Sequence, residues 1–266
     1  MIVKKFAPSP ELQSYIKCYY LSDSNYAEAV EDIFFADGCV EVVFHVGLDF
    51  YRGDEKECAA KIIGQITQPL TMRAKGKGKS FGIWFLPHTF SLFSGISVNH
   101  LNDKAISLDN IFCSNFIDFV QNCIYENDIK KLLEEINSFL FKKLRPQSNH
   151  FKDNVAEYAI QYILCKKEES NLDNLAKACN ISNRYLQKIF LEKIGYSPKF
   201  FIRVVRFQQA LHHLSTSKTC SLTALTYQLS YFDQAHFIRE FKEFTGFVPS
   251  QFHPDKHPIN QHFLSL

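Results

Sequence analysis

Several features that mark other classes of protein are missing from this sequence of 266 residues. It has no apolar run of about 18 residues, and Met1–Phe6 lacks the long apolar core of a signal peptide. The eight cysteines include no Cys-x-x-Cys pair, and no histidine lies at zinc-finger spacing from them. These absences predict a cytoplasmic chain with reduced thiols, no bound metal and no membrane partner.

Motifs of common enzymes are also absent. Gly78-Lys79-Ser80 has the form of the end of a phosphate-binding loop, but Arg73 stands where that loop requires a glycine. The sequence contains no Gly-x-Ser-x-Gly, no His-Glu-x-x-His and no Gly-x-Gly-x-x-Gly. We therefore expect no enzymatic activity and no cofactor.

The net charge of +2 is unevenly distributed along the chain. Residues 151–266 contain 14 basic and 10 acidic residues, whereas residues 1–150 contain 16 and 18. Between Ser182 and Lys218, seven basic residues accompany a single acid, Glu192. A stretch of one sign in an aromatic-rich segment indicates a polyanionic partner, and the alternative is a solvated lysine-rich surface.

The most informative feature is a repeat with an offset of 51 residues. Ser182–Phe201 aligns with Asp233–Phe252, and the matched pairs are Ser182/Asp233, Leu186/Phe237, Lys188/Arg239, Phe190/Phe241, Gly195/Gly246, Pro198/Pro249 and Phe201/Phe252. Each copy has a polar N-cap residue, an amphipathic helix, a glycine stop, a proline and an aromatic residue. Two copies of one helix predict that the protein inserts them into two equivalent grooves of its partner.

Each predicted helix carries cationic and amide side chains on the face opposite its apolar stripe. Such side chains fit guanine and adenine edges in the DNA major groove, and an apolar side chain fits a thymine methyl group. The predicted DNA contacts are Asn183, Arg184, Gln187 and Lys188 in the first copy and Gln234, His236, Ile238, Arg239 and Lys242 in the second. A helix from Pro198 to about Leu214, capped by Ser197, should join the copies. On it, Arg203 and Arg206 are expected to serve DNA phosphates or an internal ion pair.

Residues 155–254 resemble the DNA-binding domain of AraC/XylS-type transcriptional regulators, and Leu225–Phe252 follows that family's signature nearly end to end. Two residues depart from it, because the family usually has alanine at the position of Thr226 and glycine at that of Ser230. The resemblance implies two helix-turn-helix units, joined by a long helix, that enter successive major-groove segments. The partners that it implies are double-stranded DNA, a second copy of the chain and RNA polymerase.

The composition and periodicity predict an α+β protein with a β-rich first half. Ile33–Gly47 should form a hairpin around Asp37-Gly38, and Phe81–Leu86 should form a strand after an exposed turn at Lys75–Lys79. A helix is expected from Pro10 to Tyr20, and two more between Leu108 and Leu144. We place the domain limits at 1–146 and 151–254, with the boundary at Arg145–His150 and a loose tail at 255–266.

The first half also resembles, more faintly, the β-rich sensor domains that precede this DNA-binding module. The resemblance implies a small β-barrel or half-jelly-roll that binds a small-molecule effector or mediates dimerisation. Candidate residues for an apolar ligand pocket are Phe34, Phe44, His45, Trp84, Phe85 and His88, and core packing is the alternative for the aromatic ones. Two other hypotheses are a ligand-free interaction module that uses the helices of residues 108–144, and an enzyme that transfers an alkyl group to a cysteine.

Overall fold

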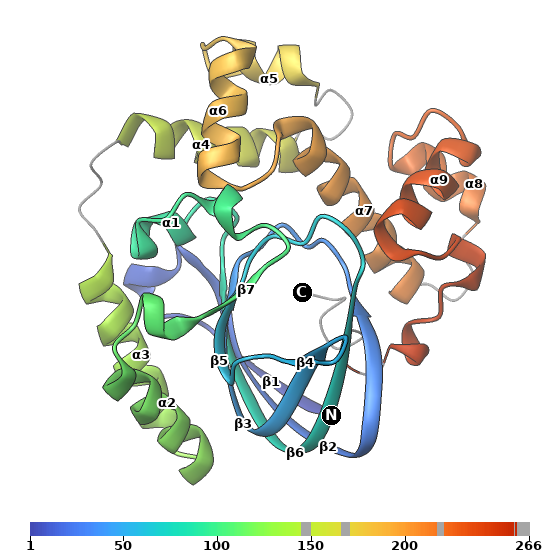
Figure 1. Cartoon of the computed structure of the whole chain (residues 1–266). Helices are drawn as coiled ribbons and strands as arrows, with labels where there is room; N and C mark the ends of the chain where they lie inside the picture. Colours follow the sequence, from blue (N-terminus) through green and yellow to red (C-terminus); the bar gives the residue numbers. More distant parts are fainter. Residues whose placement is uncertain (145–149, 166–170, 217–220, 258, 260–266) are drawn as a thin grey trace.

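The computed structural model describes all residues except 145–149, 166–170, 217–220, 258 and 260–266. Its first part is an antiparallel sheet with helices on one side, and its second part is helical (Figure 1). The predicted α+β class is therefore confirmed. The predicted boundary at 145–150 lies almost wholly outside the described residues, so the domain limits remain a prediction.

All strands of the first part belong to one antiparallel sheet of seven strands with the order β1-β2-β6-β3-β5-β7, in which β4 pairs with β3. The strands are β1 (Ile2–Phe6), β2 (Ile16–Phe34), β3 (Glu41–Arg52), β4 (Glu55–Lys56), β5 (Ala60–Ile63), β6 (Leu70–Phe85) and β7 (Ala105–Ser107). The long strands β2, β3 and β6 bend, so that the sheet curls on itself like part of a barrel (Figure 1). The described strands leave the barrel open, since β1 and β7 are its unpaired edges.

Glycines allow β3 and β6 to bend in the middle. Gly47 and Gly76 have φ angles of +73° and +113°, and the β3–β6 register shifts beside them. A Cβ on Gly78 would lie 1.9 Å from the carbonyl oxygen of Val46, so only glycine permits this close approach. The expected exposed turn at Lys75–Lys79 is therefore wrong, because these residues lie inside β6.

The expected hairpin around Asp37-Gly38 is also wrong. β2 and β3, which flank this dipeptide, both pair with β6 and not with each other. Gly38 has a φ of +80°, and a Cβ there would lie 3.2 Å from the ring of Phe201 in the second part of the chain. The loop between β2 and β3 thus packs against the helical part instead of reversing the chain locally.

The helix expected from Pro10 to Tyr20 is reduced to one 3-10 turn, η1 (Pro10–Leu12). From Ile16 onward the chain is strand β2, which β1 pairs on one side and β6 on the other. The backbone hydrogen bonds of two neighbouring strands outweigh the helical spacing of the apolar residues in this segment.

Helices cover one side of the sheet. The two amphipathic helices expected between Leu108 and Leu144 are present as α2 (Ser114–Glu126) and α3 (Ile129–Lys143). Together with α1 (Phe90–Ser94), η2 (Val98–Leu101) and η3 (Leu108–Asn110), they enclose a core that includes Tyr19, Phe44, Phe81, Phe85, Val120 and Ile136. The opposite side of the sheet faces the hollow of the curl (Figure 1).

The second part consists of two short helix pairs around one long helix. Its elements are α4 (His150–Cys165), α5 (Leu172–Ala178), α6 (Asn183–Lys193), α7 (Pro198–Thr216), α8 (Leu222–Gln228), α9 (Gln234–Thr245), η4 (Pro249–Gln251) and η5 (Pro254–Lys256). The joining helix α7 begins at the predicted Pro198 and ends two residues after the predicted Leu214. The backbone N–H of Phe200 donates to the Ser197 hydroxyl at 3.2 Å, which confirms the predicted cap.

The two parts of the chain share a buried interface. Phe35 and Ala36, from the loop after β2, belong to the core of the helical part. The Asn102 side-chain amide donates to the Gly195 carbonyl at 2.7 Å, and the Tyr196 hydroxyl donates to the Ile66 carbonyl at 2.5 Å. Apolar packing and buried hydrogen bonds therefore connect the sheet directly to the segment between α6 and α7.

The expectation of a loose tail is wrong for His257 and Ile259. The Nδ1 atom of His257 lies 2.9 Å from Oδ1 of Asp32 in β2, and the backbone N–H of Ile259 donates to Oδ2 of the same carboxylate at 2.6 Å. All three residues are buried. We call this contact of His257 and Ile259 with Asp32 the carboxyl-terminal clasp. It holds His257 and Ile259 against the sheet.

Candidate nucleic-acid interface

The first helix-turn-helix unit is formed by α5 and α6. The Asn171 side chain accepts from the Asn174 N–H at 2.9 Å, and the Ser182 hydroxyl accepts from the Tyr185 N–H at 3.3 Å, so both helices have side-chain N-caps. The inner stripe of α6, with Leu186, Ile189 and Phe190, is buried in the core of the helical part. This burial fixes which face of α6 points outward.

The outward face of α6 carries three of the four predicted contacts of the first unit. Arg184, Gln187 and Lys188 are exposed. Asn183 is half-buried, and its amide donates to the Asp173 carboxylate of α5 at 2.6 Å. Asn183 thus braces the two helices of the unit, which sequence periodicity alone did not indicate.

The second unit, formed by α8 and α9, repeats this arrangement. The Asp233 carboxylate accepts from the His236 N–H at 2.7 Å and caps α9. The turn between α8 and α9 has five residues where the turn between α5 and α6 has four. It contains Ser230 in the left-handed region at φ +56°. Buried Thr226 bonds its hydroxyl to the Leu222 carbonyl one turn back at 2.7 Å, so both departures from the family signature are accommodated.

The predicted contacts of the second unit lie on or beside the outward face of α9. Gln234, Arg239 and Lys242 are exposed, whereas Ile238 and His236 are half-buried. The Nε2 atom of His236 lies 3.8 Å from the Glu240 carboxylate, and its ring packs edge-on against Tyr231. The α9 face therefore presents one amide, two cations and a partly covered apolar side chain.

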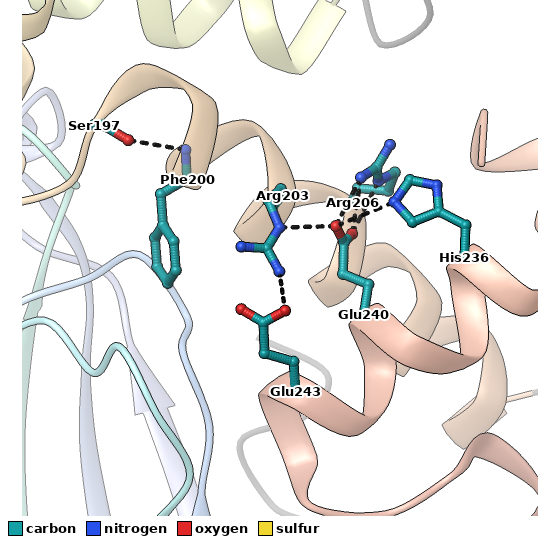
Figure 2. A network of polar contacts seen from close by, with 7 residues as sticks. All are labelled: Ser197, Phe200, Arg203, Arg206, His236, Glu240 and Glu243. Carbon is teal, nitrogen blue, oxygen red and sulfur yellow. Dashed lines mark hydrogen bonds and ion pairs between the residues drawn. The ribbon is translucent and has the colours of Figure 1, made fainter. Parts of the chain in front are cut away.

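A polar network at the joint of α7 and α9 decides the role of Arg206 (Figure 2). Arg206 donates to the Glu240 carboxylate at 2.8 Å, and its guanidinium lies 4.1 Å above the ring of Tyr231. Arg203 bonds to Glu240 at 2.8 Å and to Glu243 at 2.5 Å. Of the two predicted roles of these arginines, the structure shows the internal ion pair. We remove Arg206 from the set of DNA contacts.

Internal pairing also reduces the positive stretch noted in the sequence. Lys193, at the end of α6, is buried and lies 2.5 Å from the Asp153 carboxylate of α4. With Arg203 and Arg206, three of the seven basic residues between 182 and 218 hold helices together. Arg184, Lys188 and Lys199 remain exposed, and Lys218 lies outside the described residues.

The predicted ligand pocket is divided between three places. A cavity of about 100 Å³ inside the curl of the sheet is lined by Phe34, His45 and Trp84. Phe44 and Phe85 lie in the core under α2 and α3 on the other side of the sheet. His88 is buried between the two parts of the chain, where the nearby charges of Asp153 and Lys193 act on it. Core packing explains Phe44 and Phe85, as the alternative proposed.

Strand geometry explains this division. Neighbouring residues of a strand point to opposite faces, so Phe44 cannot share a cavity with His45, nor Phe85 with Trp84. The same alternation places Glu41 and Val43 beside His45, and both line the cavity. Glu41 and Val43 were not among the pocket residues predicted from the sequence, although their spacing of two residues on the same strand as His45 would have identified them.

Burial controls the charges in the cavity. Desolvation lowers the pKa of His45 well below its usual value, so its imidazole is neutral, and Nδ1 lies 2.7 Å from the Ser80 hydroxyl. Desolvation raises the pKa of Glu41 to about 7, although the Tyr20 hydroxyl donates to this carboxylate.

The described residues contain no group of three or more side chains that could hold a metal ion. Among the same described residues, none of the helices combines the length and the apolar character that a membrane span requires.

Two family models match the chain. Residues 4–107 match a domain of unknown function, DUF6597, and residues 175–254 match a helix-turn-helix domain. The second match covers most of the first unit and all of the second, from within α5 to the first residue of η5.

Among curated proteins, the uncharacterized HTH-type transcriptional regulator YtdP of Bacillus subtilis is 23% identical over 216 residues, which are 80% of this chain and 27% of YtdP. The F1 operon positive regulatory protein of Yersinia pestis is 35% identical over 95 residues, or 35% of this chain and 31% of that protein. The chain thus spans about a quarter to a third of the length of these relatives.

Among solved structures, ToxT from Vibrio cholerae is 10% identical with a TM-score of 0.45, and the match covers 88% of this chain and 96% of ToxT. A probable AraC family transcriptional regulator from Rhodopseudomonas palustris is 28% identical with a TM-score of 0.33, covering 37% and 93%. The tandem units, their caps and the matching domain model agree with the resemblance seen in the sequence. Residues 175–254 of this chain are a helix-turn-helix domain.

Proposed function

We propose that this chain is a sequence-specific DNA-binding transcriptional regulator whose helices α6 and α9 enter successive major-groove segments of duplex DNA. The observation that carries the proposal is the duplication itself. Two capped helices of 11 and 12 residues bury one stripe in a common core and expose cationic and amide side chains on the other face. A single enzyme site or protein groove would not require the same outward face twice.

The length of α7 supports binding on one side of the duplex. Its 19 residues span roughly 28 Å at about 1.5 Å per residue. Two readers one helical turn apart on DNA are about 34 Å apart, and the widths of α6 and α9 supply the remainder. The ion pairs of Glu240 with Arg203 and Arg206 hold α9 on this rod.

Within each unit we assign base contacts to the most exposed polar side chains. Arg184, Lys188 and Arg239 are suited to guanine, and Gln187 and Gln234 are suited to adenine. Ile238 is suited to a thymine methyl group, and we assign Lys242 and His236 to phosphate contacts. Asn183 is a positioning residue through its bond to Asp173.

The experiment is selection of binding sites from randomised duplexes with the full chain, followed by affinity measurements on the selected site. Arg184→Ala and Arg239→Ala should each cost about 1–3 kcal/mol and relax base preference at one position. Lys130→Ala is the matched control, since Lys130 is 88% exposed on α3, outside the DNA-binding part. It should leave both affinity and preference unchanged.

Three results would contradict the proposal: selection without enrichment, unchanged preference profiles in both arginine variants, or equal losses in the Lys130 control. Affinity should also fall steeply as salt rises, because phosphate contacts release counterions. Affinity that is independent of salt would rule out a DNA surface built from these cations.

We further propose that the β-rich part regulates DNA binding through a small molecule held in its cavity. Support comes from the shared interface, because the cavity wall includes Gln208 and Leu211 of α7 as well as the sheet. The alternative is a ligand-free module that pairs two copies through α2 and α3, where Tyr125 and Phe141 are 78% and 57% exposed. Sedimentation of the full chain and its Phe141→Ser variant separates the two, since only the alternative predicts a dimer that this substitution dissociates.

Alkyl transfer to a cysteine has little support. Burial raises the pKa of Cys39, which lines the cavity, to about 12, so its thiol stays protonated and poorly nucleophilic. Mass spectrometry of the chain after exposure to methylated DNA tests this activity directly, and a cysteine adduct would establish it.

A further inference from the structure

The cavity inside the curl of the sheet has a mixed wall. Six aromatic rings line it, those of Tyr20, Tyr26, Phe34, Phe35, Phe50 and Trp84. Charged side chains also reach it, so the apolar character of the rings does not by itself indicate which ligands fit. The partners of each charged side chain indicate whether the cavity suits an anionic, a cationic or an uncharged ligand.

The cations of the cavity already have a carboxylate partner within the protein. Lys61 is 1% exposed and forms an ion pair with Glu57, and the same carboxylate accepts from Arg52 Nε at 3.1 Å. Lys61 also lies 5.1 Å above the ring of Phe50. A ligand carboxylate would have to share both cations with Glu57, and it would lie beside Asp37 and Glu41, so that four carboxyl groups would face these two cations.

The acidic side chains are occupied in the same way. The Glu41 carboxylate accepts from the Tyr20 hydroxyl, and the Asp37 carboxylate accepts from the Cys39 N–H at 2.9 Å. A cationic ligand would therefore find no carboxylate that lacks a partner. The charges that line the cavity favour an uncharged molecule.

One polar atom in the wall has no partner. His45 is 6% exposed, its ring stacks on Phe50 at 4.3 Å, and its Nδ1 lies 2.7 Å from the Ser80 hydroxyl. The other ring nitrogen, Nε2, is buried and has no hydrogen-bond partner among the described residues. A buried polar atom without a partner costs free energy, which a ligand with a matching group recovers.

The size of the cavity sets the size of the ligand. About 100 Å³ is of the same order as an engineered cavity of about 150 Å³ that binds benzene. A single ring with one short substituent is therefore of a suitable size.

We propose that this cavity binds an uncharged single-ring molecule that carries one hydroxyl or carbonyl group, with the ring among the aromatic side chains and the oxygen on Nε2 of His45. The inference rests on the proposed regulatory function in one respect, since it names the chemical class of the effector. Leu211 of α7 and Ile259 of the carboxyl-terminal clasp also line the cavity, so a bound ring contacts both parts of the chain.

The test is calorimetric titration of the full chain with four molecules of similar shape: benzyl alcohol, ethylbenzene, benzylamine and benzoate. Benzyl alcohol should bind tightest. Ethylbenzene should bind about fivefold to tenfold more weakly, because it lacks the hydrogen bond to His45. Benzylamine and benzoate should bind at least tenfold more weakly than benzyl alcohol. Tightest binding of benzoate would overturn the proposal in favour of an anion site at Lys61, and tightest binding of benzylamine would also overturn it.

Two variants locate the site. His45→Phe keeps the stacking on Phe50 and removes Nε2, so benzyl alcohol and ethylbenzene should bind equally. Val43→Leu narrows the cavity and should weaken both. Unchanged affinities in Val43→Leu, or an unchanged preference in His45→Phe, would place the ligand elsewhere. The titrations of the unaltered chain decide the ligand class even where a variant fails to fold.

These titrations contain no DNA, and the site selection described above contains no ligand. Loss of DNA binding would therefore contradict the proposed regulator and leave the ligand class standing. Absence of binding by all four molecules would overturn the ligand class and leave DNA recognition standing.

Discussion

Glu41 shows how the environment of one residue sets a property of the whole protein. Desolvation is the main cause that raises the pKa of its carboxyl to about 7, and the hydrogen bond from Tyr20 opposes it. Between pH 4.5 and 7 the folded chain therefore keeps a proton that the unfolded chain has released. This carboxyl lowers the free energy of unfolding as pH rises through that window, and its effect is constant above the window.

Replacing Glu41 by Gln removes this titration while an acceptor for the Tyr20 hydroxyl remains. Relative to the unaltered chain, Glu41→Gln should gain about 1–3 kcal/mol in free energy of unfolding between pH 4.5 and pH 8. Urea denaturation of both chains at half-unit pH steps measures the difference. Parallel pH profiles would show that Glu41 titrates normally in the folded state.

The type of a side chain predicted which bonds it can form better than it predicted whether folding leaves that side chain exposed. Arg184 and Arg239 were expected on outward helix faces and are exposed there. Arg206 has the same chemistry, but its guanidinium forms an ion pair with Glu240, which lies 34 positions later in the chain. Whether an arginine is available depends on carboxylates that folding brings near, and one-dimensional spacing does not contain that information.

Glu240 connects helix α9 to the joining helix α7. It is 3% exposed and accepts from two arginines of α7, whereas neighbouring Glu243 bonds to Arg203 and its side chain is 57% exposed. Removal of a buried charge leaves its partners uncompensated, while an exposed pair contributes little.

Glu240→Gln should therefore lower the free energy of unfolding by about 2–3 kcal/mol, since the two arginines are themselves partly solvated. Glu243→Gln is the matched control and should cost no more than about 0.5 kcal/mol. Urea denaturation at neutral pH compares the two. Equal losses would mean that the network is a surface feature and does not fix α9 on α7.

Helices were predicted more accurately than strands. The period of 3.6 and the cap residues Ser182, Ser197 and Asp233 are local signals, and the helices begin where these signals stand. The strands depend on distant partners. Gly76 and Gly78 have the composition of a turn, yet they serve a bend inside β6 because Gly47 of β3 lies against them.

The carboxyl-terminal clasp connects the second helix-turn-helix unit to the sheet and to the cavity. Phe252, the last residue of the second repeat, packs against the His257 ring, and both contact Phe35 of the sheet part. Ile259 then reaches the cavity wall. Direct contacts thus connect the cavity wall to the second helix-turn-helix unit.

Ile259→Ala should lower the free energy of unfolding by about 1–3 kcal/mol, because it removes a buried side chain from the cluster formed by Tyr26, Leu48 and Ala74. Lys256→Ala, three residues earlier and exposed, should change stability by less than about 0.5 kcal/mol. Urea denaturation tests both. A harmless Ile259→Ala substitution would mean that the clasp contributes nothing to the fold.

The residues alone predict the repeat, the caps, the helical part and the chemistry of the outward faces, because each depends on positions within a few turns of one another. Folding was needed to establish the strand neighbours, the partners of Arg203 and Arg206, and the separation of His45 from Phe44, Phe85 and His88. These features arise from backbone pairing and ion pairs between segments far apart in the chain. Their free energies exist only when the whole sheet and both helical units are assembled.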